Sequence, residues 1–249
     1  MPIDLNCDLG EGAPHDAELM PLVSSANIAC GAHAGDEETM RRTIALALRH
    51  GVAIGAHPGY ADRENFGRTE QNLPPAAVGE LVRGQLLALQ RLAAEQGAAL
   101  THVKPHGALY NQAARDPALA DAIAAAVAEV DPSLVLFGLA GSHSLAAAEA
   151  RGLATASEVF ADRTYQPDGS LTPRTQPGAL IDDAPSACAQ ALRFARDGLV
   201  RTTDGRDIPL RADTVCLHGD GPYAVAFARR LRDALASAGI EVRAARGRP

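Results

Sequence analysis

Short apolar runs alternate with longer amphipathic stretches along the whole chain. The runs are nearly continuous in apolar residues, which is typical of strands that are covered on both faces. They lie at residues 3–9, 27–33, 52–57, 101–106, 134–139, 155–160 and 213–220. Because the stretches between them have room for helices, this order predicts parallel strands joined by helical crossovers.

Helix start and stop signals flank the amphipathic stretches. Asp36 precedes residues 37–50 as an N-cap, and Gly51 follows them as a residue suited to the left-handed conformation. Asp116 and Pro117 form a similar start for another helix. The other predicted helices run from Pro75 to about Gly97, from Gly141 to Gly152, from Asp182 to Gly198, and from Asp220 or Gly221 to Gly239.

The succession of these elements determines the fold class that we expect. Seven parallel strands with helical crossovers favour an α/β fold of the TIM-barrel type, a seven-stranded (β/α) barrel, over a doubly wound sheet. Residues 200–211 interrupt the alternation, and Asp204 and Gly205 predict a hairpin turn there. No linker rich in Pro, Gly or Ser divides the chain, so we expect residues 1–249 to form a single domain.

Charge and hydropathy exclude several classes of function. The formal net charge is −7 and the pI is near 5.6, whereas a nucleic-acid surface needs a basic face. No apolar run reaches the roughly 18 residues of a membrane helix, and the acidic N-terminal segment lacks the basic and apolar regions of a signal peptide. We therefore expect a cytoplasmic protein that binds neither nucleic acid nor membrane.

Polar side chains recur at or just beyond the carboxyl ends of the predicted strands. They are Asp8, His33, His57, His106, Glu158 and His218. A single histidine in such a place usually does no more than hydrogen-bond a loop. In a β/α barrel, however, these ends converge on one mouth, where the sites of this fold are built. The set as a whole therefore predicts a site at the mouth of the barrel.

Lys104 is the only lysine in a chain that otherwise carries its positive charge on arginine. Within residues 101–106, the side chains of His102, Lys104 and His106 alternate with apolar ones, so strand geometry places them on one face. Lysine offers a compact cation whose pKa responds to desolvation, whereas arginine offers a planar fork. We expect Lys104 to point into the barrel as a point charge or a titratable amine.

Several segments rich in His, Asp and Gly carry a resemblance to a known family. They are "DLNCDLGEG", "NIACGAHAGD", "GAHPGYAD" with "NFGR" shortly after, "VKPHGALYN", "SEVFADRTYQPDGSLTPR" and "CLHGDGP". On these segments, which run in order from Asp4 to Pro222, the sequence resembles the LamB/YcsF family. The resemblance implies a seven-stranded β/α barrel similar to that of the polysaccharide deacetylases and glycoside hydrolases.

The resemblance also implies an activity and a set of site residues. The implied activity is an ATP-dependent hydrolase, 5-oxoprolinase, that opens the lactam 5-oxo-L-proline to L-glutamate; this chain would be its A subunit, working with subunits B and C. The residues assigned to catalysis are Asp8, His57, Lys104, His106 and Glu158. Those assigned to binding substrate or cofactor are Asn6, Glu11, His33, Asp36, Arg68, Arg163, Arg174, His218 and Asp220.

A lactam is an unreactive amide, and phosphorylation of its oxygen by ATP would activate the carbon for attack by water. Such a route needs a cation, a group that deprotonates water, and a positive group for the substrate carboxylate. Our hypothesis gives the first role to Lys104, the second to Asp8 or Glu158, and the third to Arg163 or Arg174.

ATP, alone or with Mg²⁺, is the expected cofactor, although the chain has no GxxxxGK[ST] motif. Glycine-rich segments such as "CGAHAGDEE" and "HGDGP" lead into predicted helix N-termini, whose backbone N–H groups can bind an anion. The same glycines also suit tight turns between strand and helix. A nucleotide on this chain and a nucleotide on a partner subunit therefore both stay open.

Two other functions fit the same residues. Asp8, His57 and His106 have the character of a divalent metal site, so a metal-dependent amide hydrolase related to the deacetylases is one alternative. A non-catalytic subunit that binds a lactam or a carbohydrate is the other. An enzyme that used a metal alone would need no ATP, which separates the first alternative from the main hypothesis.

Overall fold

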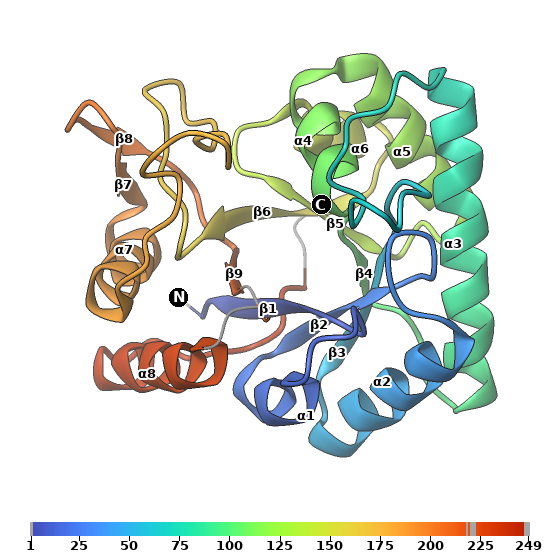
Figure 1. Cartoon of the computed structure of the whole chain (residues 1–249), viewed down its shortest axis with the longest axis horizontal. Coiled ribbons are helices and arrows are strands. Elements are labelled where there is room, and N and C mark those ends of the chain that lie inside the picture. Colours follow the sequence, from blue (N-terminus) through green and yellow to red (C-terminus); the bar gives the residue numbers. More distant parts are fainter. Residues whose placement is uncertain (1, 218, 220–222, 247–249) are drawn as a thin grey trace.

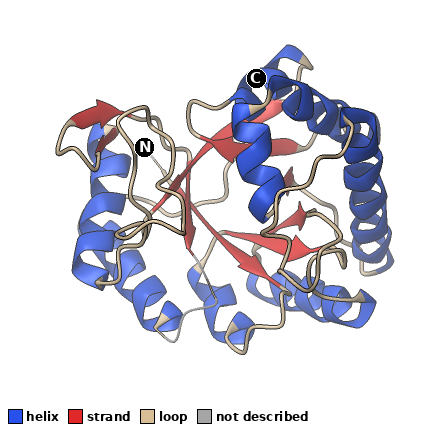
Figure 2. Cartoon of the chain, turned by 45° about the horizontal axis from the view of Figure 1, so that its top comes forward, coloured by secondary structure: helices blue, strands red, loops and turns tan. Residues whose placement is uncertain are grey.

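The protein is a barrel of parallel strands surrounded by helices. The computed structural model describes residues 2–217, 219 and 223–246. Within these residues seven parallel strands close the barrel in chain order, as Figure 1 and Figure 2 show. They are β1 (Asp4–Leu9), β2 (Ser25–Ala29), β3 (Ala53–His57), β4 (His102–Val103), β5 (Val135–Leu139), β6 (Ala154–Phe160) and β9 (Thr214–Leu217). The predicted seven-stranded β/α barrel is confirmed.

Helices connect the strands and cover the outside of the barrel (Figure 2). They are α1 (Asp16–Leu19), the 3₁₀ turn η1 (Met20–Leu22), α2 (Glu37–His50), α3 (Pro75–Glu95), α4 (Gly107–Arg115), α5 (Pro117–Val130), α6 (His143–Ala150), α7 (Ala184–Asp197) and α8 (Ala224–Ser237). Apolar side chains such as Leu86 and Leu89 of α3 are fully buried in the layer between helices and strands. Among the described residues, no helix is both long and apolar enough to cross a membrane.

The predicted caps account for where several helices begin and end. The Asp36 carboxylate accepts a hydrogen bond from the Thr39 N–H at 2.8 Å, and Gly51 ends α2 with φ +65°. Asp116 caps α5 in the same way. Asp183, one residue later than predicted, caps α7. The predicted start of the last helix, at Asp220 to Pro222, lies outside the described residues.

The interruption after α7 is the predicted hairpin. Strands β7 (Leu199–Arg201) and β8 (Asp207–Pro209) pair antiparallel, apart from the barrel. Gly205 lies in the turn between them with φ +81°, a conformation that glycine adopts without strain. The Asp204–Gly205 prediction is therefore confirmed.

Strand β4 is shorter than the strand predicted at residues 101–106, and a proline directly after the neighbouring strand β3 explains why. The Lys104 N–H donates to the Ala56 carbonyl at 2.9 Å, and the His106 N–H donates to the Pro58 carbonyl at 2.8 Å. In a parallel ladder, the Lys104 carbonyl would accept the N–H of residue 58. Proline has no N–H, so the ladder is broken and the Lys104 carbonyl remains available to another donor.

Two further differences from the predicted elements concern the site. Strand β2 begins and ends earlier than residues 27–33, so His33 lies in the loop that follows it rather than at the end of the strand. Helix α4, which was not predicted, begins directly after His106. Both differences place histidines on irregular backbone, where their position depends on tertiary contacts.

The interior of the barrel is polar at the end where the strands begin. The Asp4 carboxylate accepts hydrogen bonds from the hydroxyl groups of Ser24 at 2.6 Å and Ser25 at 2.8 Å, and from Thr214. Burial raises the pKa of the Asp4 carboxyl to about 6, against the opposing effect of these three donors. Hydrogen bonds to a buried carboxyl group thus link the strands at the end of the barrel where they begin.

Candidate active site at the barrel mouth

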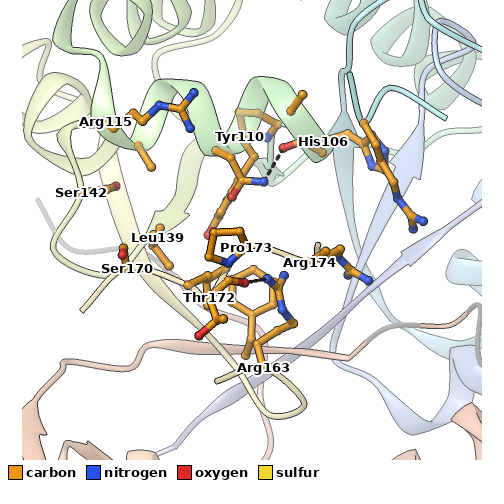
Figure 3. A pocket seen from close by; sticks show the side chains of 18 of the residues that line it. His106, Tyr110, Arg115, Leu139, Ser142, Arg163, Ser170, Thr172, Pro173 and Arg174 are labelled. Atoms are coloured by element: carbon orange, nitrogen blue, oxygen red, sulfur yellow. Dashed lines mark hydrogen bonds between the residues drawn. The ribbon is translucent and has the colours of Figure 1, made fainter. Parts of the chain in front are cut away.

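A pocket of about 1010 Å³ lies at the end of the barrel where the strands finish. Predicted site residues that line it are Asp8, Glu11, His57, Arg68, Lys104, His106, Arg163 and Arg174. Residues 163–176, in the segment between β6 and α7, form one wall, and α4 with Tyr110 and Arg115 lies opposite (Figure 3). The pocket therefore joins strand ends to two connecting segments.

Lys104 is the centre of a buried charge network beneath this pocket. Its ammonium group lies 2.8 Å from Asp8 Oδ1, 3.0 Å from Glu158 Oε1 and 3.2 Å from Asn6 Oδ1. Burial opposes the charge on Lys104, but the carboxylates, led by Asp8, outweigh it and raise its pKa well above the usual range. Lys104 is therefore a fixed cation, and its predicted orientation into the barrel is confirmed.

Asp8 pairs with Lys104 and also lines the pocket. Burial alone would raise the pKa of its carboxyl group, but His57 and Lys104 hold that pKa well below its usual range. Its Oδ1 also accepts a hydrogen bond from Asn27 Nδ2 at 2.8 Å. Its Oδ2 lies 3.3 Å from His57 Nε2. Asp8 is therefore ionised, and its two oxygens face different partners.

A layer of amides and one histidine lies below the charge network. Asn27 Nδ2 donates to Asn6 Oδ1 at 2.7 Å, and His102 Nε2 lies 2.8 Å from Asn27 Oδ1. Burial, with the nearby charge of Lys104, lowers the pKa of His102 to about 3, so its ring is neutral. A Cβ on Gly55 would lie 2.1 Å from His102 Nε2, so the ring fills the space that this glycine leaves.

Three histidines and Glu11 form a compact group on the β3 side of the pocket. One possible ligand atom from each of Glu11, His33, His57 and His106 lies within 4.8 Å of the others. The rings of His33 and His106 stack at 3.8 Å with their planes 2° apart, and His57 stands perpendicular to both at 87°. Such a group of nitrogen and oxygen atoms is suited to a metal ion.

Backbone carbonyls orient two of these rings. His57 Nδ1 lies 2.7 Å from the Lys104 carbonyl that Pro58 leaves available, and His106 Nε2 lies 2.8 Å from the Phe66 carbonyl. The other nitrogens of the two rings, His57 Nε2 and His106 Nδ1, lie 2.9 Å apart. The carbonyls thus turn one nitrogen of each ring toward the other ring.

Glu11 and His33 form a pair within the same group. Burial would raise the pKa of the Glu11 carboxyl, but hydrogen bonds with His106 and His33 lower it to about 2. Burial lowers the pKa of His33 to about 4 despite its contact of 3.2 Å with Glu11 Oε1. A carboxylate beside a neutral imidazole is the expected state of this pair at neutral pH.

Arg163 and Arg174 line the wall of the pocket that residues 163–176 form. Arg163 is almost fully buried and donates to the carbonyl groups of Thr172 at 2.6 Å and Ala179 at 3.3 Å (Figure 3). Burial and the neighbouring Arg174 lower the pKa of Arg163 to about 10, so Arg163 remains a cation at neutral pH. The pocket therefore has acidic and basic groups at its floor and cationic groups on one wall.

The chain matches one known protein family along nearly its whole length. The family model described as "LamB/YcsF family" matches residues 3–248. The chain belongs to the LamB/YcsF family. Two relatives are named as the A subunit of 5-oxoprolinase: one from Erwinia tasmaniensis is 57% identical over 97% of this chain and 99% of its own length. The other, from Brevibacillus brevis, is 54% identical over 97% of each chain.

A solved structure of a related protein has the same fold throughout. The lactam utilization protein from Thermus thermophilus is 45% identical, with a TM-score of 0.93 over 98% of this chain and 100% of the other. The fold is therefore shared over nearly the whole length of both chains.

Some predicted site residues lie away from the pocket surface. Asn6, His33 and Glu158 are buried and do not line the pocket, although each contacts a residue that does. Asp36 does not line the pocket, and its carboxylate caps α2. His218 and Asp220 lie outside the described residues.

Other residues at the site were not among the predicted ones. Asn27 links Asn6, Asp8 and His102, and its position as a polar residue within an apolar run was a signal that could have identified it. Phe66, in the family segment "NFGR", supplies a carbonyl group to His106. No side-chain chemistry at Phe66 could have pointed to that contact, because the backbone makes it.

Proposed function

We propose that this chain is the A subunit of an ATP-dependent 5-oxoprolinase, a lactam hydrolase that converts 5-oxo-L-proline to L-glutamate with partner subunits B and C. The observation that carries the proposal is one pocket that is lined by the Asp8–Lys104 pair together with Arg163 and Arg174. The names of the two relatives, together with the lactam utilization protein of the same fold, support this choice of substrate.

The reaction adds water across the ring amide. A water oxygen bonds to the lactam carbonyl carbon, the carbon–nitrogen bond breaks, and the nitrogen takes up a proton to leave as the amino group of glutamate. Phosphoryl transfer from ATP to the amide oxygen would activate the carbon for attack by water. Cleavage of the carbon–nitrogen bond then leaves the phosphoryl group on the new carboxyl as an acyl phosphate, and a second water molecule hydrolyses it to glutamate and inorganic phosphate, which draws the uphill ring opening forward. The chain must then hold a carboxylate substrate, direct a water molecule, and stabilise negative charge on oxygen.

Asp8 is the better candidate for directing water, and Glu158 for holding the lysine. Asp8 lines the pocket, whereas Glu158 is completely buried and lies 3.0 Å from Lys104. A carboxylate without access to the pocket cannot deprotonate a water molecule bound there. In this assignment Lys104 presents positive charge toward the oxygen of the scissile amide, and Glu158 positions Lys104.

The two arginines are the candidates for binding the substrate carboxylate. Both line the pocket, and an arginine fork matches the two oxygens of a carboxylate. Arg163 already donates from Nε and Nη2 to the carbonyls of Ala179 and Thr172. We therefore assign both arginines to the substrate carboxylate, with Arg163 also holding the shape of the wall.

The ATP used by the complex is assigned to the partner subunits. The segment "CGAHAGDEE" leads into α2, but the first turn of that helix is capped by Asp36 and carries Glu37 and Glu38. Arg63 donates to the carbonyls of Gly31 and Gly35 in the same loop. Because negative side chains already occupy this helix N-terminus, it is poorly suited to a phosphate.

Glutamate release from 5-oxoproline tests the proposal. The chain is assayed alone and then mixed with its B and C subunits, in each case with and without ATP. Turnover that requires both the partners and ATP is the expected result. In the active mixture, Asp8→Asn should lower kcat much more than it raises KM; the reverse pattern would indicate a subunit that only binds the lactam.

A metal-dependent amide hydrolase is the second candidate function, favoured by the Glu11, His33, His57 and His106 group. If an ion is bound there, it would supply an acidic, metal-bound water at the pocket. This enzyme would release product without partners or ATP and would lose activity to a chelator. Turnover by the chain alone, without ATP, would therefore replace the first proposal by this one.

A further inference from the structure

Four potential acceptor atoms face one another beside the pocket. His57 Nε2 lies 2.9 Å from His106 Nδ1, 3.7 Å from Glu11 Oε1 and 3.3 Å from Asp8 Oδ2. His106 Nδ1 in turn lies 3.2 Å from Glu11 Oε1. These side chains are buried or nearly so, and the distances between their facing atoms leave no room for a water molecule between them.

The backbone determines which ring nitrogens carry hydrogen. A carbonyl oxygen can only accept, so the contact of His57 Nδ1 with the Lys104 carbonyl places a hydrogen on Nδ1. The contact of His106 Nε2 with the Phe66 carbonyl places a hydrogen on that nitrogen. When both rings are neutral, His57 Nε2 and His106 Nδ1 each carry a lone pair. The two nitrogens face each other, and they also face the carboxylates of Asp8 and Glu11.

Acceptor atoms at these distances need either a hydrogen on one ring nitrogen or a metal cation between them. We infer that His57 Nε2, His106 Nδ1 and Glu11 Oε1 bind a divalent transition-metal ion of the Zn²⁺ class, with Asp8 Oδ2 beside them. Two imidazoles and a carboxylate are a ligand set that such ions prefer, whereas Mg²⁺ prefers oxygen alone. The inference concerns the same pocket as the proposed function but does not depend on ATP or on turnover.

The spacing of the three atoms fits such an ion. A triangle with sides of 2.9, 3.2 and 3.7 Å has a circumscribed radius of about 1.9 Å, slightly less than a metal–nitrogen bond of about 2.0–2.1 Å. An ion can therefore contact all three atoms from just outside their plane. The perpendicular rings of His57 and His106 suit this position, because their lone pairs converge there.

His33 has a different part in this arrangement. Its ring is stacked parallel to that of His106, and two rings in parallel planes cannot direct in-plane lone pairs at one point between them. His33 Nε2 instead lies 3.2 Å from Glu11 Oε1. A Cβ on Gly67 would lie 2.8 Å from the Cβ of His33, so the backbone holds the histidine against Glu11. We assign His33 as a positioning residue for Glu11.

The test is metal binding by the purified full chain, measured without substrate. The chain is stripped with a chelator, dialysed against Zn²⁺, Co²⁺ or Mg²⁺ and desalted, and the bound metal is then quantified. We expect about one equivalent of Zn²⁺ or Co²⁺, no retained Mg²⁺, and the intense visible bands of Co²⁺ with fewer than six ligands. A folded wild-type chain that retains no Zn²⁺ or Co²⁺, or shows only the weak bands of six-coordinate Co²⁺, would overturn the inference.

Variants locate the ion. His57→Gln and His106→Gln should each lose the stoichiometric ion, whereas His50→Gln, at the exposed end of α2, should keep it. His33→Gln should retain the ion with an affinity about 10–100-fold lower, the usual cost of losing an outer partner. Equal binding by wild type and His57→Gln would assign the metal to another part of the surface. If the variants do not fold, the Co²⁺ spectrum of the wild-type chain decides.

Discussion

Lys104 Nζ lies 3.0 Å from Glu158 Oε1, and at most 3% of either side chain is exposed. The same ammonium group lies 2.8 Å from Asp8 Oδ1. One buried cation thus contacts two carboxyl groups from different strands of the barrel. Removing one member of such a set leaves an uncompensated charge in a place that water does not reach.

Lys104→Met should lower the free energy of unfolding by about 3–5 kcal/mol, because it leaves Asp8 and Glu158 without their cation. Chemical denaturation at neutral pH measures this. Adding Glu158→Gln to Lys104→Met should recover part of the loss, since one of the two stranded charges is then removed. A double variant as unstable as the sum of both single variants would contradict the coupling.

Gly55→Ala should destabilise the protein by about 1–3 kcal/mol or more, because the new Cβ would overlap the His102 ring. The matched control is Gly84→Ala on the exposed side of α3, where a Cβ meets nothing within 4 Å. That change should stabilise by about 0.5–1 kcal/mol through helix propensity. Equal denaturation midpoints for the two variants would show that His102 moves away freely.

Asp4 should make stability fall as the pH rises through the range from about 4 to about 6. Its carboxyl group has a pKa of 3.8 in the unfolded reference and about 6 in the fold, so the folded state binds the proton more tightly. Above both values the ionised group costs about 3 kcal/mol of stability, which is absent below pH 3.8.

Comparison with Asp4→Asn isolates this contribution from those of other titrating groups. The unfolding free energy of wild type minus that of Asp4→Asn should decline by about 2–2.5 kcal/mol between pH 4 and pH 7, following the change in Asp4 alone. A difference that stays flat over this range would mean that Asp4 is ionised in the fold at pH 4.

Asp36→Ala should lower the midpoint of thermal unfolding without changing KM for the lactam. The Asp36 carboxylate accepts the Thr39 N–H and does not line the pocket. Asp116→Ala, which removes the equivalent cap from α5, provides the matched control and should lower the midpoint by a similar amount. A raised KM in Asp36→Ala alone would restore the binding role that the sequence suggested.

Local signals made much of the fold predictable. Helix α2 has the predicted bounds because Asp36 and Gly51 determine its ends through contacts within a few residues. The strand at residues 101–106 was predicted too long because the reason for its end is not local. Pro58, directly after the neighbouring strand β3, lacks the N–H that the Lys104 carbonyl would have accepted.

The candidate site was predictable only where strand geometry governs it. Lys104 could be placed in the barrel because alternation along a strand determines which face a side chain occupies. The relation of His33 to His106 could not, since His33 lies in a loop and the two rings meet only after the chain folds. Likewise, the carbonyls that orient His57 and His106 belong to the backbone, and no residue type in the sequence indicates their role.

The polar interior of the barrel also constrains how this protein can diversify. Asn6, Asn27 and Lys104 share hydrogen-bond partners. A single apolar replacement at any of them therefore leaves another buried polar group without one of its hydrogen bonds. The wall at residues 163–176 is attached to the barrel but does not form its interior. Substitutions that alter the substrate range should therefore accumulate in that wall. The buried polar residues at the floor of the pocket should change only together.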